Sequence, residues 1–232
     1  MSYADTAFTA LVPMRHHSER VPGKNYRDMA GRPLYAYILE TLQACHSVSQ
    51  IVVDTDSPVL RQGIAERFPG VQLIERPEAL RGGAVPTNAI LEHDLGVVPS
   101  RFYLQTHATN PLLQPATIER AIQAFLAAFP QKDSLFSVTR WHKRLWDARG
   151  LPVNHDPAVL LRTQDLPPLF EENSCLYLFE HDRFLASHNR LGASPLLFEI
   201  ASAEALDIDE EQDFRLVEAV LRSQARDEGS GD

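Results

Sequence analysis

Residues 8–25, FTALVPMRHHSERVPGKN, form an apolar run that is followed directly by a polar loop. The run over residues 8–14 predicts a buried strand, because it is short, apolar and bounded by polar residues. Within ten residues, the loop places four side chains that can donate to phosphate, namely Arg15, Ser18, Arg20 and Lys24. A turn at Pro22-Gly23 can fold Lys24 back toward Arg15. Taken alone, this loop is compatible both with a solvated basic surface and with an anion-binding site.

Strand patterns alternate with helical patterns through the first half of the chain. Strands are predicted over residues 8–14, 50–55, 71–76, 101–105 and 133–139, and helices over residues 33–45, 57–68, 86–95 and 114–129. Ser57 and Pro58 are residue types preferred at the N-cap and the first position of a helix. This alternation predicts a three-layer α/β fold, in which a mostly parallel, Rossmann-like sheet has helices on both faces.

The character of the chain changes after residue 139. Residues 140–173 are expected to be rich in loops and contain Trp141, Trp146 and Pro167-Pro168. Strands are predicted over residues 175–180 and 195–200, and a last helix over residues 210–221. There is no repeat and no linker, so we expect residues 1–226 to form a single domain with a protruding middle segment. We expect the tail, residues 227–232, to be disordered.

Composition narrows the class of protein. The chain has 232 residues and a formal net charge of −9, which argues against nucleic-acid binding because that function needs a basic face. No stretch approaches the roughly 20 apolar residues that span a bilayer, and the first residues lack the pattern of a signal peptide. The two cysteines, Cys45 and Cys175, are too few for a disulfide framework and suit a reducing compartment. We therefore expect a cytoplasmic protein without a membrane segment.

Polar residues follow the predicted strands at the points where the strands end. Arg15 follows the first strand, Arg76 the third and Gln105 the fourth, and Asp207 and Asp209 follow the last. In open parallel sheets, ligands bind beyond the carboxyl ends of the strands. Cations at one strand end and a carboxylate pair at another are what a magnesium–nucleotide site requires. The loop after the first strand is neither a Walker loop nor a G-x-G-x-x-G fingerprint. Alternatively to metal binding, the carboxylates of Asp207 and Asp209 could cap the last helix.

Six segments match, in order along the chain, the pattern of one known family. VPMRHHSERVPGKN (12–25) is similar to its IPARGGSKGIPGKN, RPEALRGGAVPT (76–87) to RPxELAGDTAPT, and LQTHATNPLL (104–113) to LQPTSPLR. DSLFSVT (133–139) is similar to DSVVSVT, QDLPPLFEENSCLYLF (164–179) to QDLPPxYxENGAIYI, and DIDEEQDFRLVEAVL (207–221) to DIDTPEDLELAEAL. The sequence therefore resembles the cytidylyltransferases that make CMP-activated acidic sugars, such as the acylneuraminate (sialic acid) synthetases and their relatives, the Kdo synthetases.

The resemblance implies a fold, a reaction and an assembly. It implies one α/β domain, forming a homodimer through the loop-rich middle segment. It implies that CTP and a nonulosonic acid, such as a sialic-like acid, react with Mg²⁺ to give a CMP-sugar and pyrophosphate. Positioning and charge neutralisation dominate such catalysis.

The resemblance also assigns roles to individual residues. It places Arg15, Ser18, Arg20 and Lys24 around the triphosphate, and Arg76 and Thr87 around the cytidine. It implies metal binding by Asp207 and Asp209, and catalytic roles for Arg15, Lys24 and Asp209. It places Gln105, His107, Gln164 and Asn173 on the acceptor side. Because residues 105–111 are two residues longer than the matching family segment, either Gln105 or His107 could be the residue that contacts the acceptor.

Other departures leave alternatives open. His16 and His17 replace two family glycines, so either the backbone keeps ordinary dihedrals and the imidazoles contact the ligand, or phosphate binding differs. Glu19 replaces a lysine, and Gly83 stands where the family often has aspartate. A CTP-binding module without turnover and a non-sugar acceptor such as a phosphonate remain possible. Transfer to a sugar 1-phosphate predicts a G-x-G-T-R-L segment after the first strand, which the sequence lacks.

Overall fold

The computed structural model describes residues 6–229, with side chains through residue 226. Its main feature is a seven-stranded sheet of order β5-β4-β1-β6-β8-β7-β9. The strands are β1 (Phe8–Leu11), β4 (Val48–Thr55), β5 (Gln72–Glu75), β6 (Phe102–Thr106), β7 (Ser134–Trp141), β8 (Leu169–Glu180) and β9 (Pro195–Glu199). Every pair of neighbours is parallel except those that involve β8, which runs antiparallel to β6 and β7. The expectation of a mostly parallel sheet is confirmed.

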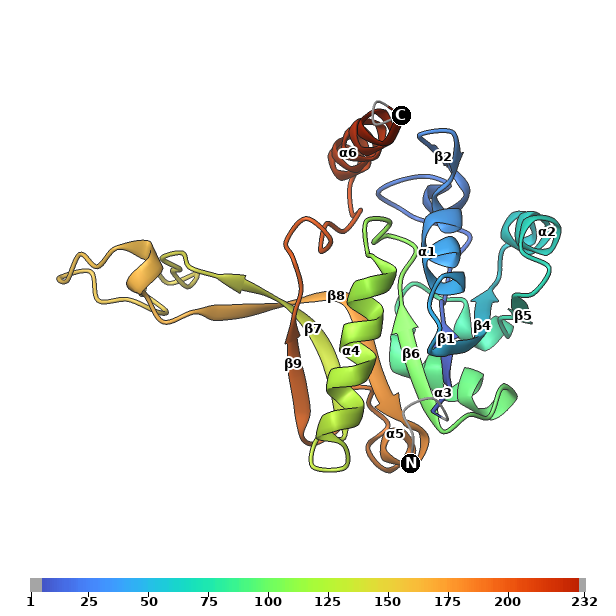
Figure 1. Ribbon diagram of the computed structural model, residues 1–232, viewed down its shortest axis with the longest axis horizontal. Helices are drawn as coiled ribbons and strands as arrows, with labels where there is room; N and C mark the ends of the chain where they lie inside the picture. The colour runs from blue at the N-terminus through green and yellow to red at the C-terminus, as the bar shows by residue number, and fades with distance from the viewer. Residues whose placement is uncertain (1–5, 230–232) are drawn as a thin grey trace.

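Helices cover both faces of this sheet, which confirms the three-layer arrangement (Figure 1). The helices are α1 (Leu34–Gln43), α2 (Pro58–Arg67), α3 (Thr87–Val97), α4 (Pro115–Ala128), α5 (His181–Ser187) and α6 (Glu211–Gly229). One core cluster packs α1, α2 and α4 against one face, and a second packs α3 and α5 against the other. As predicted, Ser57 caps α2, because its hydroxyl accepts a hydrogen bond from the Leu60 backbone N–H.

Alternation along the strands explains the two core clusters. In β1, Phe8 and Ala10 face the first cluster, whereas Leu11 faces the second. In β6, Leu104 faces the first cluster and Tyr103 the second, and both are completely buried. Successive side chains of a strand point to opposite faces, so a central strand of a three-layer fold is mostly apolar on both faces.

The first strand is shorter than predicted. β1 ends at Leu11 rather than at residue 14, because Pro13 has no backbone N–H to continue the ladder. Pairing nevertheless continues on either side of the proline: Val12 N–H donates to Val52 O and Met14 N–H donates to Asp54 O, each at 2.9 Å. The polar loop therefore leaves the sheet directly above the end of β4.

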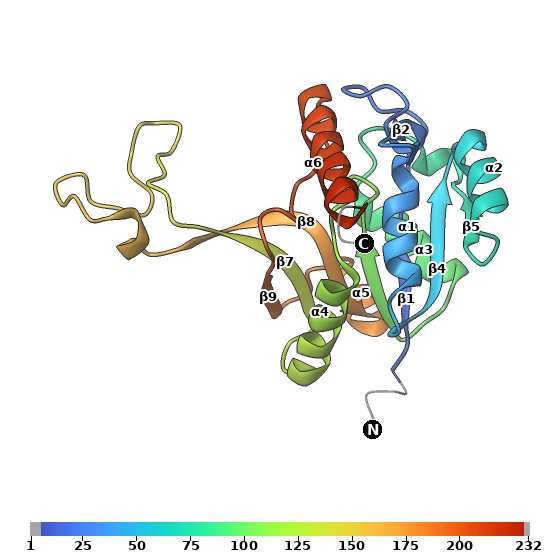
Figure 2. The ribbon, with the colours of Figure 1, turned by 45° about the horizontal axis from the view of Figure 1, so that its top comes forward.

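The middle segment projects from the sheet as an arm (Figures 1 and 2). Its base is a two-stranded ribbon, in which Val138 of β7 pairs with Glu172 of β8 and Trp141 pairs with Leu169. The expected loop over residues 140–173 is thus wrong at both ends, and residues 142–168 lie outside the two strands. β-Branched and aromatic residues near the loop ends favour this extension of the strands.

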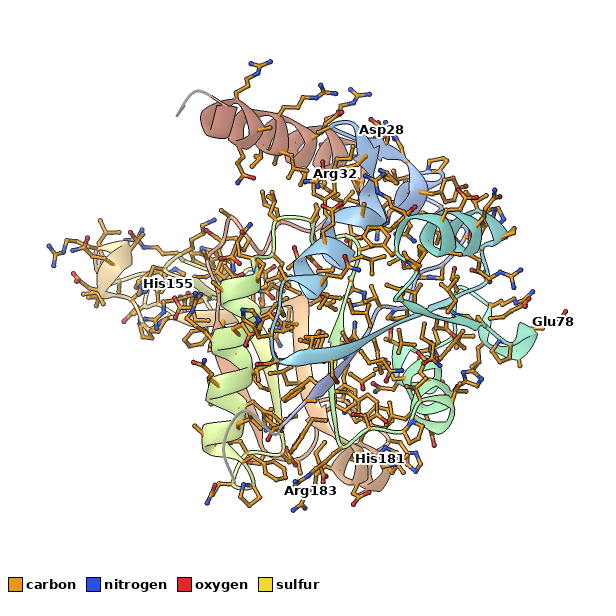
Figure 3. All side chains as sticks on the ribbon, turned by 45° about the vertical axis from the view of Figure 1, so that its right-hand side comes forward. Asp28, Arg32, Glu78, His155, His181 and Arg183 are labelled. Carbon is orange, nitrogen blue, oxygen red and sulfur yellow. The ribbon has the colours of Figure 1, made fainter. Side chains whose placement is uncertain are left out.

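Several elements were not predicted from the sequence. They are α5, a short hairpin of β2 (Asp28–Met29) and β3 (Arg32–Pro33), and three 3₁₀ helices, Lys24–Tyr26, Glu78–Leu80 and Thr163–Asp165. The hairpin contacts α6, where the Ala30 N–H donates to Glu218 Oε1 at 3.4 Å, and it lies beside this helix in Figures 1 and 3.

The last helix is longer than predicted. α6 continues to Gly229, so the first half of the tail expected to be disordered is helical, as the helix formers in this stretch allow. Residues 230–232 lie outside the described residues. Within the described residues, no helix is long and apolar enough to cross a membrane.

We expect Gly192→Ala to destabilise the protein. Gly192 has a φ of +62°, and an added Cβ would lie 2.5 Å from Oδ1 of Asp133. The Asp133 carboxylate accepts from the Ala193 and Ser194 backbone N–H groups at 2.8 and 2.9 Å, so moving it breaks this turn. We expect a loss of about 2 kcal/mol or more in the free energy of unfolding. Urea denaturation followed by circular dichroism measures it.

Gly96→Ala is the matched control. Gly96 lies within α3 and an added Cβ meets nothing within 4 Å, so this change should stabilise the protein by about 0.5–1 kcal/mol. Equal effects of the two substitutions would contradict the account of the Gly192 turn.

Candidate functional site

A cavity of about 670 Å³ opens at the carboxyl ends of β1, β4 and β6, a volume within the range of small-molecule sites. Charged side chains dominate its lining. The cations are Arg15, Arg20, Lys24, Arg81 and Arg190, and the carboxylates are Glu19, Asp56, Asp207 and Asp209. Ser18, Thr87 and His107 line it as well. The structure therefore brings together eight of the twelve residues that were expected to form the site.

The loop after β1 folds back on itself at the cavity wall. Gly23 adopts a φ of +67°, which a residue with a Cβ rarely adopts, and the following 3₁₀ turn begins at Lys24. The Asn25 side chain then donates to Arg15 O at 2.9 Å, which joins the two ends of the loop. The expected return of Lys24 toward Arg15 is thus observed, and the cations of the loop face one space.

The two adjacent histidines have different environments. The backbone N–H of His16 donates to Asp56 Oδ1 at 2.7 Å, its Nδ1 lies 2.7 Å from Ser57 Oγ, and its ring stacks on Tyr26. His17 lines the cavity and His16 does not. Neither has a positive φ, so the backbone keeps ordinary dihedrals without the two glycines.

A carboxylate pair lies directly against the loop at the cavity wall. Arg20 Nη2 donates to Asp209 Oδ1 at 2.6 Å, and Lys24 Nζ donates to the backbone oxygen of Ile208 at 2.5 Å. Burial and the neighbouring Asp209 raise the pKa of Asp207, whose Oδ1 is buried and has no hydrogen-bond partner among the described residues. Burial in turn lowers the pKa of Lys24, although both carboxylates oppose this shift.

The alternative that these carboxylates cap the last helix is not observed. The Asp209 and Glu210 backbone N–H groups donate instead to Oδ2 of Asp213, at 3.1 and 2.7 Å. The side chains of Asp207 and Asp209 line the cavity instead, and Asp209 is paired there with Arg20.

A neutral histidine lies at the inner side of the cavity. Oε1 of Gln105 accepts from Arg190, so its amide nitrogen, 2.9 Å from Nε2 of His107, is the donor in that contact. Nε2 then carries no proton, and the ring proton is on Nδ1. Burial, together with the charges of Arg190, Lys24 and Arg15, lowers the pKa of His107 to about 3. His107 is thus uncharged at physiological pH.

Four residues expected to bind ligands do not line the cavity. Gln105 is completely buried beneath it and reaches it only through His107 and Arg190. Arg76 is also completely buried, and its guanidinium is paired with the Asp54 carboxylate. These two residues support the cavity rather than form it.

The other two lie in the arm and at its base. Gln164 is exposed in the 3₁₀ turn Thr163–Asp165 of the arm. Asn173 is buried in β8, where its Oδ1 accepts from Ser137 Oγ at 2.6 Å and its Nδ2 donates to Thr139 Oγ1 at 3.0 Å. These bonds bridge the register shift between β7 and β8, so Asn173 has a structural place within one chain.

Sequence reasoning missed several residues of the cavity. Arg81 and Ser174 lie within the family-like segments 76–87 and 164–179 but were assigned no role, and Asp56 and Arg190 lie outside all six segments. Arg190 follows α5, a helix that was not predicted, and Ser174 is placed by a local φ of +59°. For Arg190, neither a strand end nor a motif in the sequence gives a signal, and for Ser174 the motif does not indicate that its side chain faces a cavity.

A second cluster of charged groups is buried next to the cavity. Asp54, His93 and Asp94 could offer metal ligands within 4.8 Å of one another, but the Arg76 guanidinium already lies against Asp54. Burial and the adjacent Asp54 charge raise the pKa of Asp94 to about 8. The proton on Asp94 and the positive charge of Arg76 thus offset the charges of the two buried carboxyl groups. The Arg76 backbone oxygen also accepts from Arg81 Nε at 2.8 Å, which links this cluster to the cavity wall.

We expect the Asp94 carboxyl to make stability fall as the pH rises. Its pKa is about 8 in the folded chain and about 3.9 when unfolded, so the folded state holds one more proton between these values. The stabilisation is complete below pH 4 and is lost between about pH 4 and pH 8. Asp94→Asn should flatten the dependence of Tm on pH in this window and raise Tm at pH 8. Scanning calorimetry over this range measures it.

Glu75→Gln, an exposed carboxylate near the same strand end, is the control and should leave the slope unchanged. An unaltered slope in Asp94→Asn would contradict the protonated state of Asp94.

Comparisons with known proteins agree with this arrangement. A family model described as cytidylyltransferase matches residues 9–225. The 8-amino-3,8-dideoxy-manno-octulosonate cytidylyltransferase of Shewanella baltica is 29% identical over 117 residues, or 50% of this chain and 46% of that protein. The protein of the same name from Shewanella oneidensis is 28% identical over the same shares. The matched segment thus spans about half the length of these curated relatives.

Solved structures share the fold across nearly the whole chain. A CMP:2-keto-3-deoxy-manno-octonic acid synthetase complexed with CTP aligns with a TM-score of 0.70 and 15% identity, covering 94% of this chain and 99% of that one. A 4-diphosphocytidyl-2C-methyl-D-erythritol synthase aligns with a TM-score of 0.68 and 16% identity, covering 94% and 100%. At these identities, the likeness concerns the fold alone.

Proposed function

This chain belongs to the cytidylyltransferase family, and we propose that it transfers CMP from CTP to a hydroxyl group of an acidic sugar and releases pyrophosphate. The observation that carries this proposal is the convergence of a cationic loop and a carboxylate pair on one cavity. The curated relatives are named for an octulosonate acceptor, which favours an acid of that kind. A sialic-like nonulosonic acid and a phosphonate remain alternatives for the acceptor.

The loop after β1 is suited to hold the triphosphate. Arg15, Arg20 and Lys24 supply cationic donors, and Ser18 supplies a hydroxyl, on one side of the cavity. Arginine and lysine form strong charge-assisted bonds to phosphate oxygens. Arg20 is now paired with Asp209, and both are about half exposed, so this pair can exchange for contacts with phosphate and metal at little cost. We assign Thr87, which also lines the cavity, to the nucleoside.

Asp207 and Asp209 fit a magnesium ion. Carboxylate oxygens are the ligands that Mg²⁺ prefers, together with substrate phosphates, and Asp207 Oδ1 is a buried acceptor without a partner among the described residues. The burial that raises the pKa of Asp207 is what a cation offsets. When bound, Mg²⁺ would neutralise phosphate charge and favour departure of pyrophosphate.

The chemical step is a displacement at the α-phosphorus. The acceptor hydroxyl oxygen forms the new P–O bond and gives up its proton to water, and the bond to the bridging oxygen breaks with its electron pair going to pyrophosphate. Lys24 and Arg15 stabilise the charge that develops on the phosphates. We assign Asp209, the more exposed carboxylate of the pair, to polarising the attacking hydroxyl. His107 is neutral in the apo cavity and contributes a hydrogen bond rather than a charge.

We further propose a homodimer that forms through the arm. Large apolar side chains are exposed along residues 142–168 of one chain, including Trp146, Val153 and Leu160, of which Leu160 is 87% exposed. Apolar exposure concentrated on one projecting segment favours burial against a partner. The cytoplasmic location stays a prediction; the two free, buried cysteines are compatible with it.

We expect the carboxylate pair to be required for turnover. With CTP, Mg²⁺ and 2-keto-3-deoxy-manno-octonate or a sialic acid, the unmodified chain should release pyrophosphate, and Asp207→Asn and Asp209→Asn should each lower kcat by about 100-fold or more. A coupled pyrophosphate assay measures this, with mass spectrometry of the CMP-sugar. Asp182→Asn, an exposed residue of α5, is the matched control and should keep full activity. Calorimetric binding of CTP without pyrophosphate release, across sugar acids and phosphonates, would favour the binding-module alternative.

We expect the arm to determine the oligomeric state. Light scattering coupled to size exclusion should give twice the mass of one chain, and the double variant Leu160→Asp, Leu161→Asp should give the mass of one chain, because charge in an apolar contact is costly. Leu216→Asp, at a similarly exposed position on α6, is the control and should remain dimeric. Elution of the unmodified chain at the mass of one chain would rule out the proposed dimer.

A further inference from the structure

Arg190 is a cavity-lining cation that has no carboxylate partner. No ion pair involves it among residues 6–226, whereas Arg20 of the loop after β1 is paired with Asp209. The acidic groups that act on it are the Tyr177 hydroxyl and, more weakly, Glu172, whose own carboxylate accepts from that hydroxyl at 2.5 Å. Burial is the largest effect on the pKa of Arg190 and lowers it. A partly buried guanidinium without a counter-anion favours an anionic ligand.

The guanidinium is fixed in place by its neighbours. Its plane lies over the Tyr177 ring, with 3.6 Å between the guanidinium carbon and the ring centroid. Its Nη1 donates to Gln105 Oε1 at 2.5 Å, and its backbone N–H faces Asn88 Oδ1 at 3.4 Å. Stacking on Tyr177 and hydrogen bonds to Gln105 and Tyr177 hold the side chain but leave several of its five N–H donors for a ligand. The remaining donors can form the two parallel bonds that a planar carboxylate accepts.

The position of Arg190 separates it from the triphosphate loop. Tyr177 and Gln105 are paired residues of β8 and β6, whereas the loop leaves β1, on the other side of β6. Arg190 is the charged group with the largest effect on His107, ahead of Lys24 and Arg15. The cavity thus has cations at two ends, with the carboxylates of Asp207 and Asp209 also lining it. An acceptor that attacks a phosphate held at the loop would occupy the other end.

We propose that Arg190 binds the carboxylate of the acceptor acid and is the residue that makes the enzyme select an acidic acceptor. This inference rests on the proposed function, because it assigns the acceptor end of the same cavity. It gives Gln105 a positioning role, since that amide holds both Arg190 and His107. Arg190, the residue that would bind the acceptor's negative charge, lies outside all six family-like segments.

The test compares an acid with its uncharged ester. For the unmodified chain, KM for 2-keto-3-deoxy-manno-octonate should be about 100-fold below that for its methyl ester. Arg190→Met should raise KM for the acid by about 100-fold, leave KM for the ester within about 3-fold, and leave KM for CTP within about 3-fold. Arg190→Lys, which keeps the charge without the planar fork, should lie in between.

Arg183→Met is the matched control, since Arg183 is an exposed arginine of α5 that lies outside the cavity lining and at the lower edge of Figure 3. It should leave all three constants unchanged. A rise in KM for CTP in Arg190→Met, with the preference for the acid retained, would overturn the proposal and assign Arg190 to the triphosphate. Equal losses for acid and ester would also overturn it.

Equilibrium binding separates this inference from the proposed reaction. Calorimetric titration of 2-keto-3-deoxy-manno-octonate and its methyl ester is run on the unmodified chain and Arg190→Met, with unfolding curves to confirm that both are folded. Binding of the acid that depends on Arg190, without pyrophosphate release, would support the inference and contradict the proposed function. Turnover of the acid with unchanged affinity in Arg190→Met would contradict the inference alone. No binding of the acid to either chain would overturn the inference.

Discussion

The pairing of the chain just beyond β1 with β4 is the constraint on which the site depends. Val12 and Met14 donate to the backbone oxygens of Val52 and Asp54 at 2.9 Å on either side of a proline that interrupts the strand. This register fixes where the loop after β1 starts, and the His16 N–H continues the contact by donating to Asp56 at 2.7 Å. A shift of the register by two residues would move the loop by about 7 Å along the strand direction. The cations would then no longer face the carboxylate pair.

Groups that do not line the cavity determine its electrostatics. Beneath one wall, the buried Arg76 pairs with Asp54, while Asp94 stays protonated and therefore uncharged. The cluster of two carboxyl groups and one guanidinium thus has no net charge. Beneath the inner side, the Gln105 amide bridges Arg190 and a neutral His107. The buried groups beneath the cavity are thus either uncharged or paired with one another. The unpaired charges lie at the surface of the cavity, where an anionic nucleotide and an acidic acceptor can reach them.

The sequence was sufficient for the sheet, most helices and the placement of the loop after β1 at the cavity, because alternation, helix caps and strand-end polarity are local signals. It failed where position depends on contacts between distant segments. Arg76 has the residue type of a ligand-binding cation, but its place in the core follows from packing against Asp54. Asn173 matches a family segment, yet it satisfies buried groups at a register shift that no local pattern predicts. The role of Arg190 could not be predicted from the sequence, because the residue follows a short helix that was not predicted. Its guanidinium is positioned by stacking on Tyr177, a contact between distant segments.

The central claim is that one cavity holds a magnesium–CTP complex between the loop after β1 and the carboxylate pair. A crystal structure with CTP and Mn²⁺, using anomalous scattering to locate the metal, tests it most directly. The account predicts one manganese peak at Asp207 and Asp209, with the triphosphate extending to Arg15 and Lys24. Manganese between Asp54 and Asp94, or a triphosphate bound away from the loop, would contradict it.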